Sequence, residues 1–161
     1  MVFVAVFTAC TNQKSKETIK EPVVIKSTVG LEQTIENLID SILKVKQTER
    51  RKALFRFLSY KDQVDGGVAE EYCMFAAEYP KNNTRDFFEI LSSKDTDFLD
   101  VWAKIASAEL ALNSGEKQNI NKEMTSYKTA LEAKTKMFSA LQAKLVKHYL
   151  ERLNYYTIKS F

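Results

Sequence analysis

Apolar residues recur at helical spacing along most of this chain. From Leu31 onward they step by four and three residues, through Ile35, Leu38, Ile42 and Val45, which places them on one face of a helix. The same kind of pattern predicts four further helices, over about residues 48–60, 68–79, 83–91 and 95–113.

The residues between these patterns are turn formers. Lys61–Gly67 ends in paired glycines, which indicates a turn. Pro80 is expected to stop the third helix, Asn83 or Thr84 to cap the fourth, and Gly115 to end the fifth. The side chains expected to face inward in helices two, three and five are Leu54, Phe57 and Leu58; Val68, Tyr72, Phe75, Ala76 and Tyr79; and Phe98, Val101, Trp102, Ile105 and Leu112.

The last segment, from Glu116 to about Lys159, contains no glycine and no proline. One helix of about forty residues would measure about 60 Å, longer than a compact domain of this size, so it must bend, break near Ala140 or project. Its stripe at heptad-like spacing indicates either a core helix, the interpretation we favour, or an exposed seam for a partner helix. The stripe consists of Ile120, Met124, Tyr127, Leu131, Phe138, Leu141 and Leu145, with Lys134 as an interruption.

Together these patterns predict an all-α fold. Short antiparallel helices joined by short turns indicate an α–α array or an irregular bundle, with a long C-terminal helix. The 161 residues suit a single helical domain over residues 30–161.

The N-terminus has a different character. An uncharged apolar run ends in Phe7-Thr8-Ala9-Cys10, and polar residues follow at once. This shape resembles the signal sequence and lipobox of bacterial lipoproteins, in which the cysteine is lipidated and the preceding peptide is removed. Thr8 and Ala9 match the small residues of that pattern, whereas Phe7 stands where an aliphatic residue is usual. The basic residues that open a signal peptide are missing, so we expect the true start to lie upstream of Met1.

The resemblance implies a signal peptide over residues 1–9 and a lipidated cysteine with a flexible tether over residues 10–29. Thr11 follows the cysteine, where the aspartate that retains lipoproteins in the inner membrane would stand, so the outer membrane of the cell envelope is the expected location. The alternative is a buried strand or helix edge, because Val2, Val4 and Val6 have strand-like branching. The run is too short to span a bilayer as a helix.

Candidate catalytic residues are few. His148 is the only histidine, and we expect it to be partly buried and hydrogen-bonded. Cys73 lies among large apolar residues and is expected to be a small buried thiol; a Cys73–His148 pair or a Cys10–Cys73 disulfide is the alternative. The carboxylates of Asp95, Asp97 and Asp100 lack the glycine of a calcium loop and suit the start of a helix. We therefore predict no catalytic residue, metal site or cofactor.

The densest basic stretch runs from Lys44 to Lys52 and continues to Arg56. It indicates a solvated turn between two helices, with anionic head groups or an acidic partner as the alternative. No aromatic residues alternate with these charges, and the net charge of +3 is too small to indicate nucleic-acid binding.

The function expected from these features is that of a lipid-anchored helical interaction or scaffolding protein of the bacterial cell envelope. The membrane would be contacted through the lipid on Cys10, and a protein partner through the helical domain. Because ten of the aromatic residues between Phe55 and Trp102 gather in the middle helices, the alternative is a carrier that holds an apolar ligand in a cavity among them.

Overall fold

The computed structural model describes residues 28–161, which are all helix, turn or irregular backbone, with no strand among them. The predicted all-α class is confirmed. The helices in chain order are α1 (Thr28–Lys44), α2 (Gln47–Leu58), α3 (Gly66–Asn82), α4 (Thr84–Glu89), α5 (Thr96–Ser114), the single 3-10 turn η1 (Lys117–Asn119), α6 (Ile120–Glu132) and α7 (Ala140–Lys159).

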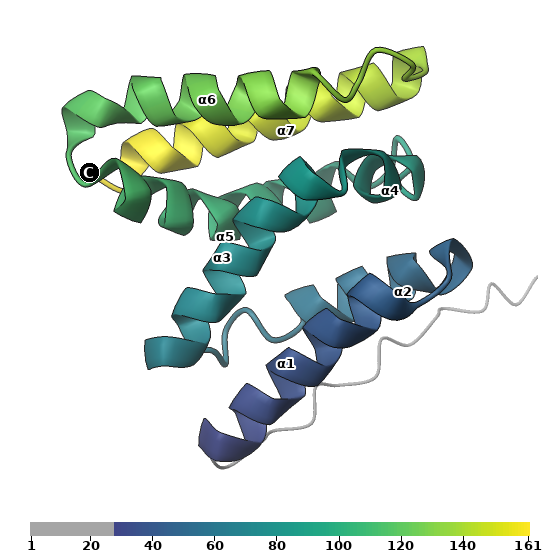
Figure 1. Ribbon diagram of the computed structural model, residues 1–161, viewed down its shortest axis with the longest axis vertical. Coiled ribbons are helices and arrows are strands. Elements are labelled where there is room, and N and C mark those ends of the chain that lie inside the picture. The colour runs from purple at the N-terminus through teal and green to yellow at the C-terminus, as the bar shows by residue number, and fades with distance from the viewer. Residues whose placement is uncertain (1–27) are drawn as a thin grey trace, which may run out of the picture.

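These helices are stacked on three levels (Figure 1). The antiparallel pair α1 and α2 lies at the lower end of the view, α3, α4 and α5 lie in the middle, and α6 and α7 lie side by side and antiparallel at the top. The most extensive packing is that of α5 against α7, followed by α3 against α5. The arrangement is an irregular bundle in which α5 is the central helix.

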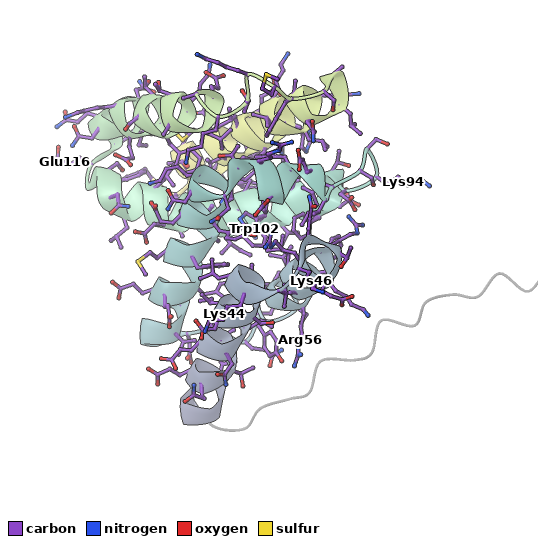
Figure 2. All side chains as sticks on the ribbon, turned by 45° about the vertical axis from the view of Figure 1, so that its right-hand side comes forward. Lys44, Lys46, Arg56, Lys94, Trp102 and Glu116 are labelled. Carbon is purple, nitrogen blue, oxygen red and sulfur yellow. The ribbon has the colours of Figure 1, made fainter. Side chains whose placement is uncertain are left out.

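The core is rich in aromatic rings, and Trp102 lies at its centre (Figure 2). Burial of side chains of this size is the main contribution to the stability of such a fold. The largest fully buried side chains are Trp102, Tyr72, Tyr149, Phe57, Phe87, Phe88, Ile35, Ile42, Leu54, Leu99, Leu110 and Leu131. The inward faces predicted for α1 and α2 are confirmed, except that Val45 is only partly buried. In α5, however, Leu112 is 65% exposed, and Leu110 takes the buried position.

The C-terminal segment breaks into two helices. Residues 133–139 form a turn, and α7 starts with a capping box: the Ser139 hydroxyl accepts from the backbone N–H of Gln142, and the Gln142 side chain accepts from the N–H of Ser139. The break lies just before Ala140, where one of our three expectations put it. Because the turn interrupts the heptad-like stripe, Phe138 is only partly buried and Leu141 is 42% exposed.

The expected stop at Pro80 is wrong, since α3 continues to Asn82. Proline has no N–H to give to the carbonyl four residues earlier, which is that of Ala76. In this fold the indole Nε1–H of Trp102 donates to that carbonyl oxygen at 2.7 Å. The proline is tolerated inside the helix because a side chain of α5 replaces the missing donor.

Two glycines occupy helix ends that require positive φ. Gly115 has φ +65° and ends α5 as predicted. Gly66 has φ +49°, and it begins α3 instead of ending the preceding turn. Asn83 precedes α4, but its side chain makes no capping hydrogen bond.

Candidate functional site

The predicted lipidation site, Cys10, lies outside the described residues, as do the signal peptide over residues 1–9 and most of the tether. The described residues begin with α1 at Thr28. No helix in residues 28–161 combines the length and the apolar character that crossing a bilayer requires.

His148 is partly buried and hydrogen-bonded, as predicted. Its Nε2 lies 2.8 Å from Oδ1 of Asp100, and Nε of Arg152 lies 3.0 Å from Oδ2 of the same carboxylate. Arg152 also donates to the hydroxyl of Tyr156 and lies over the rings of Tyr155 and Tyr156. These side chains join α5 to α7, which is a structural use of the histidine.

Cys73 is a half-buried free thiol on α3. Burial raises the pKa of this thiol, and the negative charge of Glu109 raises it further, so the thiol stays protonated at neutral pH. A protonated thiol is a poor nucleophile. It borders a hollow of about 280 Å³ between α3 and α5, lined by Lys61, Asp62, Val64, Tyr72, Cys73, Val101, Lys104 and Ile105. Since His148 binds Asp100, the alternative pairing with Cys73 has no geometric support.

The three carboxylates of the acidic run separate in space. Asp95 is buried and forms two hydrogen bonds with the guanidinium of Arg51, at 2.6 and 2.7 Å, as well as bonds from the backbone N–H and hydroxyl of Ser92. The Arg51 guanidinium holds the pKa of Asp95 at about 2, below its usual value. Asp97 is exposed, and Asp100 faces α7. Among residues 28–161 no three histidine, cysteine or acidic side chains gather as metal ligands would.

The basic stretch covers more than the turn we predicted: it begins at the last residue of α1, crosses the turn at residues 45–46 and continues into α2 as far as Arg56. Two of its arginines are structural. Arg50 pairs with Asp86 at 2.6 Å and donates to the carbonyls of Ile42 and Val45 at the end of α1. Arg51 binds Asp95. Figure 2 shows Lys44, Lys46 and Arg56 in the lower half of the molecule with α1 and α2. The basic surface is therefore smaller than the sequence suggests.

The middle helices place their aromatic rings against one another. Phe57 stacks on Tyr72 with 4.0 Å between ring centroids, and Phe87 lies 5.0 Å from Trp102. All four rings are at most 1% exposed. Rings in direct contact fill the space in which a carrier would hold its ligand, so this packing gives the carrier alternative no support.

A larger hollow than the one beside Cys73 lies between α6 and α7. It is an open groove of about 690 Å³ lined by Asn121, Met124, Thr125, Lys128, Glu132, Thr135, Ala143, Val146, Lys147, Leu150, Glu151 and Asn154. Met124, Val146 and Leu150 form its apolar floor and are buried. Lys128 and Lys147 stand on opposite walls. The sequence pattern did not single out this groove, because it depends on the break between the two helices.

Charge is distributed unevenly between the levels of the bundle. Residues 116–161, which form η1, α6 and α7, contain nine basic and four acidic side chains. Residues 28–115 contain eleven basic and fifteen acidic side chains. The level that carries the groove is thus positive, and the rest of the described domain is negative.

The surface also exposes a few large apolar side chains. Met137 in the turn between α6 and α7 is 92% exposed, and Tyr155, Ile158 and Phe161 near the chain end are between 42% and 48% exposed. The aromatic chain end is therefore only partly docked, through Tyr156 and the buried Thr157.

Comparison of this chain with protein-family models, with curated proteins and with solved structures finds no match.

Proposed function

We propose that this protein is a membrane-tethered helical binding protein of the bacterial cell envelope. A lipid on Cys10 holds it at the membrane, and the helical domain binds a protein partner. The observation that carries the membrane half is the sequence Phe7-Thr8-Ala9-Cys10, which ends an apolar run and precedes a polar stretch. Two or more acyl chains on one cysteine give a firm anchor.

Binding is favoured over catalysis by the way the polar side chains are used. His148 and Asp100 join α5 to α7, Asp95 is bound by Arg51, and the Cys73 thiol is kept protonated. An open groove with an apolar floor and polar walls has the composition of a protein interface. We infer that α6 and α7 present the binding surface.

The membrane half is tested by the intact mass of the protein purified from its own cells. We expect a mature chain that begins at Cys10 and carries acyl groups. Cys10→Ala at the native locus should move the protein from the membrane fraction to the soluble fraction, whereas Cys73→Ala is the matched control and should leave it at the membrane. An unmodified chain that begins at Met1, or a Cys10→Ala variant that stays at the membrane, would refute the anchor.

Within a Gram-negative envelope we propose the outer membrane, because Thr11 follows the cysteine in place of aspartate. Density-gradient separation of the two membranes tests this address. Thr11→Asp should shift the protein toward the inner-membrane fraction. A wild-type protein found in the inner membrane would contradict the proposal on location while leaving the anchor itself intact.

A further inference from the structure

We propose that the groove between α6 and α7 binds an amphipathic helix of a partner protein, with an apolar stripe flanked by carboxylates. This inference rests on the protein-binding half of the proposed function and is independent of the lipid on Cys10. Three observations support it: the shape of the groove, the chemistry of its floor and walls, and the net charge of the α6 and α7 level in which it lies.

The shape suits a short helix. The residues of α6 that line the groove run from Asn121 to Glu132, a distance of about 16 Å along the helix, or about three helical turns. Helix α7 supplies the other wall, and it runs antiparallel beside α6 (Figure 1). An open trough of this kind covers one face of its occupant and leaves the other in solvent. A helix with one apolar stripe has that property, whereas a small apolar ligand needs most of its surface covered.

The floor and walls match the two faces of such a helix. Met124, Val146 and Leu150 offer a strip of apolar surface, and they come from both helices, so the stripe of a partner would contact α6 and α7 together. Asn121 and Asn154 lie on the walls, one on each helix, and carry amide groups that can donate to a partner's polar flank.

The lysines on the walls are available to carboxylates of a partner. Lys128 lies 3.8 Å from Glu132, and Lys147 lies 3.9 Å from Glu151; both pairs are wide and largely exposed, so they hold the lysines only weakly. Lys136 and Lys144, both exposed, directly follow the groove residues Thr135 and Ala143. The groove lining itself is balanced, with Lys128 and Lys147 against Glu132 and Glu151. The positive excess comes from the level around it, where residues 116–161 contain nine basic and four acidic side chains, and this surrounding charge favours an acidic occupant.

The test measures binding of two synthetic helical peptides to the full chain with Cys10→Ala, which removes the lipidation site. Both peptides carry leucines at helical spacing; the acidic probe has glutamates beside the stripe, and the basic probe has lysines there. At physiological salt the acidic probe should bind at least about tenfold more tightly by fluorescence anisotropy. The difference should shrink at 1 M salt, where the Debye length is about 3 Å.

Two neighbouring residues of α6 provide a matched pair of variants. Thr125 lines the groove and Ser126 does not, and both side chains are exposed hydroxyls that can be replaced without opening the core. Thr125→Glu should weaken the acidic probe by about tenfold or more, and Ala143→Glu on the opposite wall should do the same. Ser126→Glu adds the same charge outside the groove and should change binding by less than about twofold.

Several results would overturn the inference. These are equal binding of the two peptides, no binding of either, or equal effects of Thr125→Glu and Ser126→Glu. Binding of phosphatidylglycerol vesicles that Thr125→Glu abolishes, with neither peptide bound, would make the groove a lipid site instead. Because the Cys10→Ala chain carries no acyl group, the peptide experiment is independent of the test of the lipid anchor. If Cys10 proved not to be acylated, the groove proposal would still stand. If neither peptide bound, the anchor proposal would still stand.

Discussion

The indole N–H of Trp102 in α5 donates to the carbonyl of Ala76 in α3, the acceptor that Pro80 leaves without its helical donor. One turn of α3 is thus completed by a side chain of another helix. The next carbonyl, that of Ala77, accepts from the hydroxyl of Tyr127 in α6. Two helices of the bundle are fixed to α3 at the turn that contains its proline.

Trp102→Phe should lower the free energy of unfolding by about 2–4 kcal/mol, because it removes buried volume and leaves the Ala76 carbonyl without this donor. In a Pro80→Ala background the N–H of residue 80 can serve that carbonyl, so the same substitution should cost about 1 kcal/mol less. Urea unfolding followed by far-UV circular dichroism measures the four variants of this cycle. An equal cost in both backgrounds would show that the hydrogen bond contributes nothing beyond packing.

Asp95→Asn should destabilise the protein by about 2 kcal/mol at pH 7, since the buried carboxylate binds Arg51 and Ser92. The pKa of Asp95 is about 2 in the folded chain, below its usual 3.8. The contribution of this carboxylate is therefore complete above about pH 4 and is lost as the pH falls through about 2.

The measurement is the free energy of unfolding from pH 7 down to pH 2, and the gap between wild type and Asp95→Asn should narrow over the acid end of that range. Asp97→Asn is the control: Asp97 is exposed in the first turn of α5, so the loss of its charge should cost less than about 1 kcal/mol. A difference in unfolding free energy that stays constant down to pH 2 would contradict the low pKa of Asp95 in the folded chain.

The two buried hydroxyls of Tyr127 and Tyr149 should respond unequally to removal. Tyr127 donates its proton to the Ala77 carbonyl, so in the 3.1 Å contact between the two hydroxyls Tyr149 is the donor. Tyr127→Phe leaves both Ala77 and Tyr149 without this partner and should cost about 1–3 kcal/mol. Tyr149→Phe leaves the bond to Ala77 in place and should cost less. Thermal unfolding of the two variants gives the order, and the reverse order would contradict this direction of donation.

Ser139→Ala should destabilise the protein by about 1 kcal/mol, because the capping box at the start of α7 loses its hydroxyl. Ser126→Ala, in the exposed face of α6, removes a hydroxyl that caps nothing and should be neutral or slightly stabilising. Chemical denaturation of both variants compares the two positions. Equal stabilities would mean that the turn 133–139 starts α7 without help from its cap.

The all-α class and most helices could be predicted from the apolar spacing because one buried face per helix is a local pattern. Leu31, Ile35, Leu38 and Ile42 are buried as that spacing predicts. The heptad-like stripe was misleading at residues 133–139, where α6 has ended and a new helix is about to start. The S-x-x-Q pattern of the capping box formed by Ser139 and Gln142 was the signal that could have shown this break.

Other features depend on partners distant in sequence. Pro80 is accommodated by a residue of α5. Arg51 is hydrogen-bonded to Asp95, although 44 positions separate the two residues in the sequence. The groove between α6 and α7 has the same origin, since its walls face one another only after the chain turns at residues 133–139. Periodicity within one helix contains no information about such pairs.

The position of the indole at this contact has an experimental use. Trp102 is the chain's only tryptophan, and it is fully buried where α3 meets α5. Its intrinsic fluorescence should therefore emit at short wavelength while those two helices stay together and shift to longer wavelength when water enters between them. Stopped-flow mixing with denaturant, followed by this fluorescence, would then measure the rate at which α3 separates from α5, with no attached dye. Circular dichroism would follow the loss of helix in the same sample.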